Sequence, residues 1–241
     1  MEGRGGRQEL RSGPVGDARV TGPVGLPTGA EIRIANDAAP LAVVLVNGGS
    51  ARTVPGTWSA TSELLTTELA PRFAGLAFAE VRYRVKTWNE LDSCLADARA
   101  ALDLVDRPTL LVGFSMGGAV SIGVSAHPSV VGVLGLAPWI PERLPLDGLV
   151  GKRFDVLHGS WDRYLPGIPG VSATSSRRGF DRATALGVEG TYALIARGLH
   201  GAAVRRRTGA LLRLPRAQAW VDGVGERLAF FQDQASRRRS R

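Results

Sequence analysis

The sequence lacks several features that would place the chain in a specialised class. Cys94 is its only cysteine, so no intramolecular disulfide can form. The longest strongly apolar run, residues 130–140, is far shorter than the roughly 20 residues that a membrane-spanning helix needs. The first residues contain no apolar segment of the kind that a secretion signal requires. We therefore expect a cytoplasmic protein that has no disulfide and does not interact with a membrane.

Lysine is also scarce. Lys86 and Lys152 are the only two lysines, although the chain has a net charge of +8. The excess positive charge lies mainly in residues 205–207 and 237–241, both rich in arginine. A nucleic-acid-binding domain usually carries a basic stripe across a folded face, often with interleaved aromatic residues. Aromatic residues make up only 6% of this chain. We therefore predict no nucleic-acid partner.

The remaining composition is that of an ordinary globular domain, with 44% hydrophobic and 22% charged residues in a chain of 241. Residues 1–29 are rich in glycine, arginine and proline without periodicity, which predicts a flexible extension with room for a short edge strand. Residues 236–241 are expected to form a basic, disordered tail. Residues 30–235 contain neither a repeat nor a Gly/Ser linker, so we expect one domain there.

Within this domain, short apolar runs alternate with amphipathic segments, which is typical of parallel strands joined by crossover helices. Strands are expected at residues 41–46, 78–83, 109–112, 130–136, 153–157 and 191–195. Helices are expected at residues 59–69, 87–105, 115–126, 175–186 and 215–234. Thr87 and Glu90 resemble a capping box, and Pro215 suits a first helical turn. This order predicts an α/β fold with a mostly parallel, doubly wound sheet and helices on both faces.

One motif stands between the strand expected at 109–112 and the helix that follows it. Residues 113–117 read Gly-Phe-Ser-Met-Gly, a G-x-S-x-G pattern in a strand–turn–helix context. The sharp turn lifts the serine hydroxyl above the sheet, and the flanking glycines let strand and helix approach closely. The motif therefore predicts that Ser115 is a nucleophile.

The motif resembles the nucleophile elbow of the α/β-hydrolase family, and two further segments fit that family's pattern. Residues 158–162, His-Gly-Ser-Trp-Asp, resemble its H-G-x-x-D segment, and residues 198–200, Gly-Leu-His, resemble its G-x-H segment. The resemblance implies a catalytic triad in which Asp162 is the acid and His200 is the base. Ser115, Asp162 and His200 follow the family's chain order, and each comes after an expected strand.

These residue types suit acyl transfer, because an imidazole can take the serine proton and a carboxylate can orient the imidazole. The family takes its oxyanion donors from the backbone N–H after the nucleophile and from a Gly-rich loop after an early strand. This implies Met116 and Gly49 as the donors. Glu142, in the loop after residues 130–136, is the alternative acid, and Asp155 is a poorer choice because it lies inside a strand.

The other reactive residue types have structural interpretations. His127 ends the elbow helix, where a cation suits the helix dipole, and His158 is expected to brace the turn that carries the acid. Cys94 lies in the middle of an expected helix and is interpreted as inert. No Cys/His cluster or nucleotide-binding motif is present, so we predict neither a metal nor a cofactor.

Several residues in loops near the expected site are candidates for lining a substrate pocket. They are Asn47, Gly48, Ser50, Phe114, Trp139 and Trp161. Only residues 137–152 separate the strands between which many family members insert a cap, so we expect no large cap and an open cleft. Residues 163–174 are the candidate for a short flap.

The resemblance is to compact, capless esterases and dienelactone-hydrolase-like members, although dienelactone hydrolases proper have cysteine where this chain has Ser115. It implies a serine hydrolase that cleaves small or medium carboxylic esters, thioesters or lactones through an acyl-enzyme. The alternative is a non-catalytic member of the family that binds a small ligand. The sequence does not indicate an oligomeric state.

Overall fold

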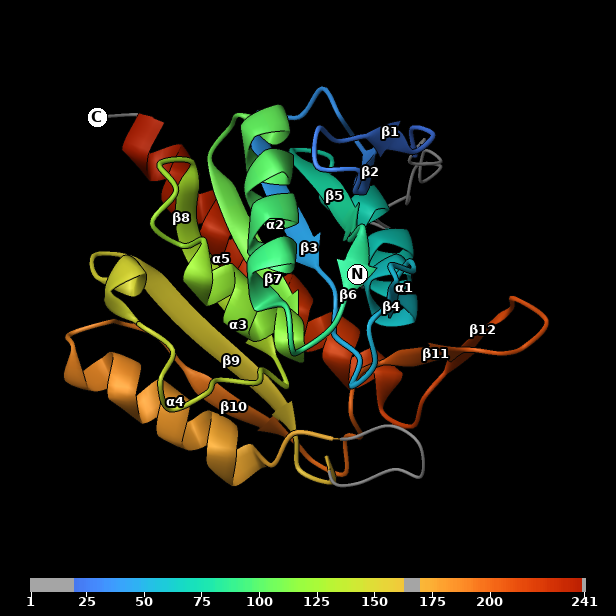
Figure 1. Cartoon of the computed structure of the whole chain (residues 1–241). Helices are drawn as coiled ribbons and strands as arrows, with labels where there is room; N and C mark the ends of the chain where they lie inside the picture. The colour runs from blue at the N-terminus through green and yellow to red at the C-terminus, as the bar shows by residue number, and fades with distance from the viewer. Residues whose placement is uncertain (1–19, 163–169, 240–241) are drawn as a thin grey trace, which may run out of the picture.

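A computed structural model describes residues 20–162 and 170–239 of the protein (Figure 1). Its main sheet contains eight strands in the order β1-β2-β5-β3-β7-β8-β9-β10. In that order they are β1 (Val24–Gly25), β2 (Glu31–Ala35), β5 (Leu76–Arg82), β3 (Leu41–Val46), β7 (Thr109–Phe114), β8 (Val130–Leu136), β9 (Arg153–Gly159) and β10 (Tyr192–Ile195). The six strands from β5 to β10 are parallel, and β1 and β2 are antiparallel to their neighbours. The predicted α/β fold with a mostly parallel sheet is confirmed.

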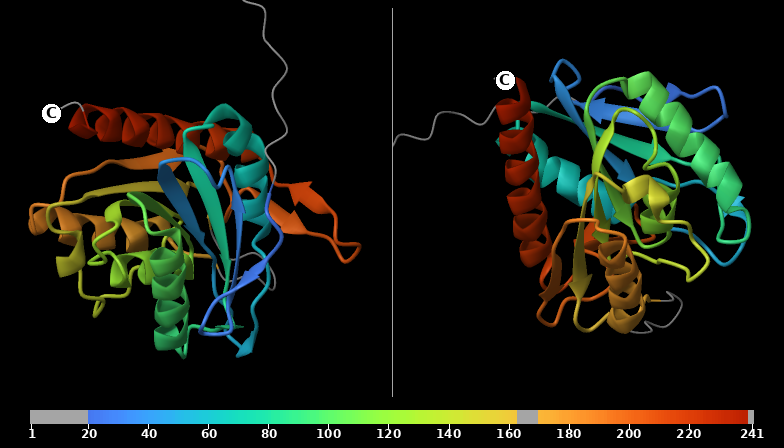
Figure 2. Two further views of the ribbon diagram at one scale, coloured as in Figure 1. Left: turned by 90° about the horizontal axis from the view of Figure 1, so that it is seen from above. Right: turned by 90° about the vertical axis from the view of Figure 1, so that its left-hand side faces the viewer.

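Helices cover both faces of this sheet (Figure 2). Helices α1 (Ala60–Leu69) and α5 (Ala217–Arg239) lie on one face, and α2 (Leu91–Val105), α3 (Met116–Gly123) and α4 (Ala173–Ala185) lie on the other. Strand β3 is buried along its whole length. Because side chains alternate along a strand, Val43 and Leu45 join the core under α1 and α5, whereas Val44 and Val46 join the core under α2, α3 and α4.

Strand β2 was not among the strands expected from the sequence. Its residues alternate between charged and apolar side chains, and the charged ones find partners on other elements. Glu31 pairs with Arg82, and Arg33 Nη2 lies 2.9 Å from Glu80 Oε2 and 2.8 Å from Glu63 Oε2. Strand β1, within the expected extension, pairs with β2 at the edge of the sheet. Residues 1–19 lie outside the described residues.

Two predicted helix starts and the predicted tail are wrong. Helix α2 begins at Leu91, because Thr87 Oγ1 accepts a hydrogen bond from the Asn89 amide and Glu90 makes no capping bond. Helix α5 begins at Ala217, so Pro215 lies before its first turn. The same helix continues to Arg239, so residues 236–239 are helical rather than disordered. Residues 240–241 lie outside the described residues.

Short elements complete the described chain. Between β8 and β9 it contains only the short 3-10 helix η2 (Asp147–Leu149), and a second one, η1 (Ala70–Arg72), follows α1. Strand β4 (Val54–Pro55) pairs with β6 (Val85–Lys86), and β11 (Ala203–Arg205) pairs with β12 (Leu211–Arg213) in a hairpin that projects from the body (Figure 1). The insertion point before β9 therefore holds no large cap. Most of the expected flap, residues 163–169, lies outside the described residues.

None of the helices in the described ranges is both long and apolar enough to span a membrane.

Candidate active site

Ser115 occupies the junction between β7 and α3 in an unusual backbone conformation. Its φ of 55° and ψ of −119° lie in a region that L-residues other than glycine rarely adopt. Its amide donates to the Leu136 carbonyl at 3.0 Å, and its carbonyl accepts from the amides of Gly118 and Trp139, each at 2.9 Å. These bonds hold the strained turn in place. Ser115 Oγ has no hydrogen-bond partner among the described residues.

The glycines on either side of Ser115 allow α3 to approach the sheet. A Cβ at Gly117 would overlap the carbonyl oxygen of Val46 and lie 2.6 Å from that of Asn47. A Cβ at Gly113 would lie 2.6 Å from the carbonyl carbon of Gly117. All of these atoms belong to the backbone, which cannot rotate away, so a larger residue would push the helix off the strand.

Gly117→Ala is therefore expected to lower the free energy of unfolding by about 3 kcal/mol, because the added methyl group meets fixed carbonyl oxygens of β3 and its loop. Urea unfolding measures this change as a lower midpoint at unchanged slope. Gly25→Ala is the control, since a Cβ there meets nothing within 4 Å, and it should change stability by less than about 0.5 kcal/mol. Equal midpoints for both variants would show that α3 does not approach the sheet this closely.

Asp162 and His200 come together because their loops follow neighbouring parallel strands, β9 and β10. The Trp161 amide donates to the Gly198 carbonyl at 2.9 Å and ties the two loops to each other. His200 Nδ1 lies 2.7 Å from Asp162 Oδ2. The Asp162 side chain is fully buried and the His200 side chain is 4% exposed. This contact leaves Nε2 as the ring nitrogen of His200 that can accept a proton.

The Asp162 carboxylate contacts a second histidine. His158 Nε2 lies 3.1 Å from the same Oδ2 atom, and Oδ1 is buried without a hydrogen-bond partner among the described residues. Burial alone would raise the pKa of the Asp162 carboxyl, but the hydrogen bonds from His158 and His200 outweigh it and hold that pKa below its usual value. Asp162 is therefore a carboxylate at neutral pH.

The loop that carries His200 packs against the residue that precedes the strained serine. The ring centroids of Phe114 and His200 are 4.9 Å apart. A Cβ at Gly201 would lie 2.8 Å from Thr61 Oγ1 and 3.0 Å from Phe114 Cζ, so this loop lies close to both α1 and β7. His200 is thus placed beside the turn at Ser115, although no hydrogen bond joins the two side chains.

The Gly-rich loop after β3 is held from three sides. Tyr83 Oη donates to the Asn47 carbonyl at 3.1 Å, Asn47 Nδ2 donates to the Thr57 carbonyl at 2.7 Å, and Asn47 Oδ1 accepts from the Gly48 amide at 2.7 Å. Burial raises the pKa of the Tyr83 hydroxyl well above its usual value, so this donor stays protonated. Asn47 thus uses its amide side chain to shape the loop.

This loop lies against the elbow. A Cβ at Gly48 would lie 3.4 Å from Ser115 Cβ, and one at Gly49 would overlap Met116 Sδ and lie 2.5 Å from Trp88 Nε1. The Gly48 amide is already bonded, whereas the Gly49 amide has no acceptor among the described residues. Met116 is the first residue of α3, where a backbone N–H has no partner within the helix. Two free amide donors therefore flank Ser115.

The remaining pocket candidates surround the site to different degrees. The Trp139 amide bonds the Ser115 carbonyl, and its indole is half-buried against the core. Trp161 is 57% exposed beside Asp162. The Ser50 carbonyl accepts from the Trp88 amide at 3.1 Å, which anchors the end of the Gly-rich loop. Glu142, the alternative acid, is exposed and makes no hydrogen bond to His200.

A second Ser–His–Asp grouping lies at the opposite edge of the sheet, before β8. His127 Nδ1 lies 2.8 Å from Ser129 Oγ, and His127 Nε2 lies 3.1 Å from Asp103 Oδ1. Asp103 is 72% exposed, and Ser129 is not among the residues with positive φ. Helix α3 ends at Gly123, so the prediction that His127 ends the elbow helix is wrong, and His127 instead lies in the turn between α3 and β8. Burial raises the pKa of the Cys94 thiol to about 11, which fits the interpretation that Cys94 is inert.

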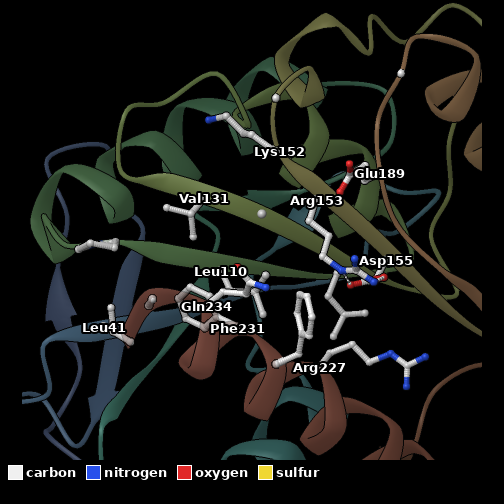
Figure 3. A pocket seen from close by; sticks show the side chains of 17 residues that line it. Leu41, Leu110, Val131, Lys152, Arg153, Asp155, Glu189, Arg227, Phe231 and Gln234 are labelled. Carbon is white, nitrogen blue, oxygen red and sulfur yellow. Dashed lines mark hydrogen bonds and ion pairs between the residues drawn. The ribbon is translucent and has the colours of Figure 1, made fainter. Parts of the chain in front are cut away.

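A cavity of about 540 Å³ lies between α5 and the sheet, near the beginnings of β7, β8 and β9 (Figure 3). Leu110, Leu134 and Phe231 are among its apolar lining residues. Two of its charged lining residues pair with each other, since Arg153 Nε lies 2.7 Å from Asp155 Oδ2. None of the predicted site residues lines this cavity.

Across residues 20–162 and 170–239, no group of three or more His, Cys, Asp or Glu side chains is arranged to hold a metal ion.

Solved structures with similar folds share little sequence with this chain. A sugar hydrolase from Lactococcus lactis is 17% identical, has a TM-score of 0.66, and matches over 88% of this chain and 98% of its own. A serine hydrolase without a lid from Xanthomonas campestris is 15% identical, with a TM-score of 0.53 over 76% and 86% of the two chains. The esterase domain of a Rhodothermus marinus protein is 14% identical, with a TM-score of 0.53 over 76% and 90%.

This chain has the α/β-hydrolase fold. No protein-family model and no curated protein matches its sequence, so the similarity lies in the tertiary structure.

The α/β-hydrolase fold of this chain also contains site residues that the sequence did not single out. Tyr83 and Thr57 hold the Gly-rich loop, Thr61 contacts the loop after His200, and Trp88 packs on Gly49. Tyr83 ends an expected strand, but nothing local indicates that its hydroxyl reaches Asn47, 36 positions away. Such supporting contacts join distant segments and therefore leave no pattern along the chain.

Proposed function

We propose that the protein is a serine hydrolase that cleaves small or medium carboxylic esters, thioesters or lactones through an acyl-enzyme. The observation that carries this proposal is the buried Asp162–His200 hydrogen bond beside a serine held in a left-handed backbone conformation. The lidless serine hydrolase and the esterase domain with the same fold support it, because their titles name this class of chemistry. The absence of a large cap before β9 favours small or medium substrates.

In the proposed reaction, Ser115 Oγ attacks the carbonyl carbon of the ester while His200 Nε2 takes the serine proton. Asp162 holds the imidazole through Nδ1 and stabilises the imidazolium that forms, without becoming protonated itself. His200 then gives the proton to the leaving alcohol, which departs as the acyl-enzyme forms. Water repeats the attack with His200 again as the base, and the acid is released. A rotation of the Ser115 side chain completes the contact with His200, since such bonds often tighten only in the substrate complex.

The developing oxyanion needs donors that already point at it. The amides of Met116 and Gly49 are proposed to supply them, because neither has a partner among the described residues, Met116 follows Ser115 directly, and Gly49 lies against Met116. The amide of Gly48 is the poorer donor, since Asn47 Oδ1 already accepts its hydrogen. Among the candidate pocket residues, Phe114 supports His200 and Trp161 offers an exposed surface to a substrate.

Treatment with a fluorophosphonate tests this proposal directly. We expect intact-mass analysis to show one covalent adduct on the wild type and none on Ser115→Ala, because only an activated serine attacks phosphorus at a useful rate. Ser129→Ala is the matched control, since Ser129 also contacts a histidine but has no strained turn or free amides beside it. It should be labelled like the wild type. A folded wild type without an adduct would instead favour a protein that binds a ligand without cleaving it.

A further inference from the structure

The Asp162 carboxylate is shared by two buried histidines, and only one of them has a role in the proposed function. His200 Nδ1 and His158 Nε2 lie 2.7 and 3.1 Å from the same atom, Asp162 Oδ2. The side chains of His158 and Asp162 are both fully buried. No other hydrogen-bond partner of the carboxylate is present among the described residues. Within residues 20–162 and 170–239, the contacts of this carboxylate are therefore those with the two rings.

The surroundings of His158 determine which nitrogen carries its hydrogen. Nε2 is hydrogen-bonded to the Val171 carbonyl at 2.9 Å and also lies 3.1 Å from Asp162 Oδ2; both partners are acceptors, so Nε2 carries the ring hydrogen and shares it between them. Nδ1 lies 2.7 Å from Ser176 Oγ on α4. In the neutral ring, Nδ1 accepts from that hydroxyl, and Tyr192 Oη, 2.8 Å from Ser176 Oγ, completes the network. Every polar atom of the buried ring is then satisfied without a net charge.

A neutral His158 suits the charge changes of the proposed reaction. When His200 becomes an imidazolium, a second positive charge on the same carboxylate oxygen would oppose it. A neutral N–H donor adds no such repulsion, yet it still fixes the carboxylate and draws electron density from Oδ2. Asp162 then interacts less strongly with the imidazolium than a carboxylate bonded to His200 alone would.

We propose that His158 is a positioning residue for the base: by donating from Nε2 to Asp162 Oδ2, it orients the carboxylate and weakens the interaction of that carboxylate with the His200 imidazolium. This role rests on the proposed function, since it acts on the catalytic group through Asp162. Ser176 has a supporting part, because its hydroxyl holds the His158 tautomer from the other side.

In the part of the chain that the structure describes, few ionisable groups lie on the elements packed around the His158 ring. They are Asp162 and His200 in the loops after β9 and β10, Tyr192 on β10, and Arg177 and Asp181 on α4. Arg177 lies over the Tyr192 ring, 5.1 Å from its centroid, and pairs with Asp181 at 2.8 Å. Burial raises the pKa of Tyr192, so that hydroxyl stays protonated at neutral pH. The carboxylate of Asp162 is thus the charged group that His158 contacts directly.

Two substitutions at His158 separate this role from a packing role. His158→Leu retains most of the volume and removes the donor, whereas His158→Gln keeps an amide N–H near the position of Nε2. With a short-chain chromogenic ester, His158→Leu should lower kcat by about 10-fold to 100-fold at nearly unchanged KM. The acidic limb of its pH–rate profile should move to higher pH by about half a unit, because Asp162 becomes more basic. His158→Gln should restore the limb and most of kcat.

Phe180→Leu is the matched packing control. Phe180 lies on the same helix as Ser176, packs against Phe154 and Tyr192, and contacts neither histidine. Phe180→Leu should therefore lower the free energy of unfolding without moving the acidic limb of the pH–rate profile. The proposal would be overturned if the acidic limb of the pH–rate profile did not move in His158→Leu. It would also be overturned if Phe180→Leu moved that limb by the same amount. Failure of His158→Gln to restore the limb in a folded protein would also overturn it.

A second measurement tests the action of His158 on Asp162 without relying on catalysis. The ¹³C signal of the Asp162 carboxyl, assigned by its loss in Asp162→Asn, reports the titration of that group directly. It should titrate at higher pH in His158→Leu than in the wild type. If the wild type fails to react with the fluorophosphonate but this shift is seen, the proposed function fails while the action of His158 on Asp162 stands. If labelling succeeds and Asp162 titrates identically in both proteins, the function stands and the positioning role is overturned.

Discussion

Replacing Ser115 with alanine is expected to reduce ester turnover by about 100,000-fold while leaving the free energy of unfolding almost unchanged. In the proposed reaction, the substitution removes the oxygen atom that would form the acyl bond, so no covalent intermediate could arise. Ser115 Oγ has no hydrogen-bond partner among the described residues, so little folded-state interaction is lost. Steady-state kinetics on a short-chain ester and urea unfolding of the same samples measure the two effects.

Ser115→Gly is the informative companion to this variant. Alanine keeps the Cβ and hence the strain of a φ of 55°, whereas glycine adopts that region freely. Glycine relieves the backbone strain but costs more conformational entropy on folding than alanine does. With both effects counted, we expect the free energy of unfolding of Ser115→Gly to exceed that of Ser115→Ala by about 1 kcal/mol. Both should be inactive. Equal stability of the two variants would mean that the turn stores no strain, and residual turnover above about 1% of wild type in either would remove Ser115 from the nucleophile role.

Replacing Asp162 with asparagine is expected to lower kcat by about 1,000-fold to 10,000-fold at neutral pH. The asparagine amide can donate to His200 Nδ1, which would move the ring hydrogen to Nε2. His200 Nε2 could then no longer accept the Ser115 proton. The positive charge that forms on His200 would also lose its counter-ion, because Asp162 Oδ2 is the only carboxylate oxygen at hydrogen-bond distance from that ring among the described residues.

Two further carboxylates serve as controls for Asp162. Asp155 lies on β9, the strand before the Asp162 loop, but pairs with Arg153 and accepts from the Thr191 amide at 2.7 Å. Asp155→Asn should reduce stability and leave kcat within about twofold of the wild type. Glu142→Gln should also retain activity. If Glu142→Gln loses turnover and Asp162→Asn does not, the acid is Glu142.

The charge of Asp162 also gives a pH dependence of stability with a definite sign. Because its pKa is lower in the folded state than in the unfolded state, its contribution to stability is fully present above the unfolded value, near 4. The contribution is lost as the pH falls through the folded-state pKa. The stability of the wild type relative to Asp162→Asn should therefore decrease on acidification below about pH 4. A constant difference between the two proteins across that range would contradict the lowered pKa.

The sequence predicted the part of the fold that depends on local periodicity. Each of the six expected strands is present, since a buried parallel strand needs a short apolar run and β-branched residues, both of which are visible in one segment. It predicted the elbow for the same reason, because the G-x-S-x-G pattern and its flanking strand and helix are contiguous. Strand β2 was not predicted because it contains two charged residues, Glu31 and Arg33. Both are half-buried in the structure, where they form ion pairs with residues of β5 and α1.

The expected ends of α2 and α5 were wrong because competing local bonds decide where a helix begins. Thr87 Oγ1 bonds the Asn89 amide in a turn, so Thr87 does not cap the helix, and α2 starts four residues later. A hydroxyl can satisfy either arrangement, and the sequence does not distinguish them. The arginine-rich C-terminal segment through Arg239 continues α5, because basic residues suit a helix C-terminus.

The doubly wound architecture and three candidate catalytic residues in family order, each after a strand, were predicted from sequence patterns alone. How those residues meet depends on the tertiary structure. It placed Asp162 Oδ2 within hydrogen-bond distance of both His200 and His158, left Glu142 without contact to His200, and set Phe114 against the His200 ring. The physical reason is that hydrophobic periodicity acts within one segment, whereas sharing one carboxylate oxygen requires loops from neighbouring strands to close on each other in three dimensions.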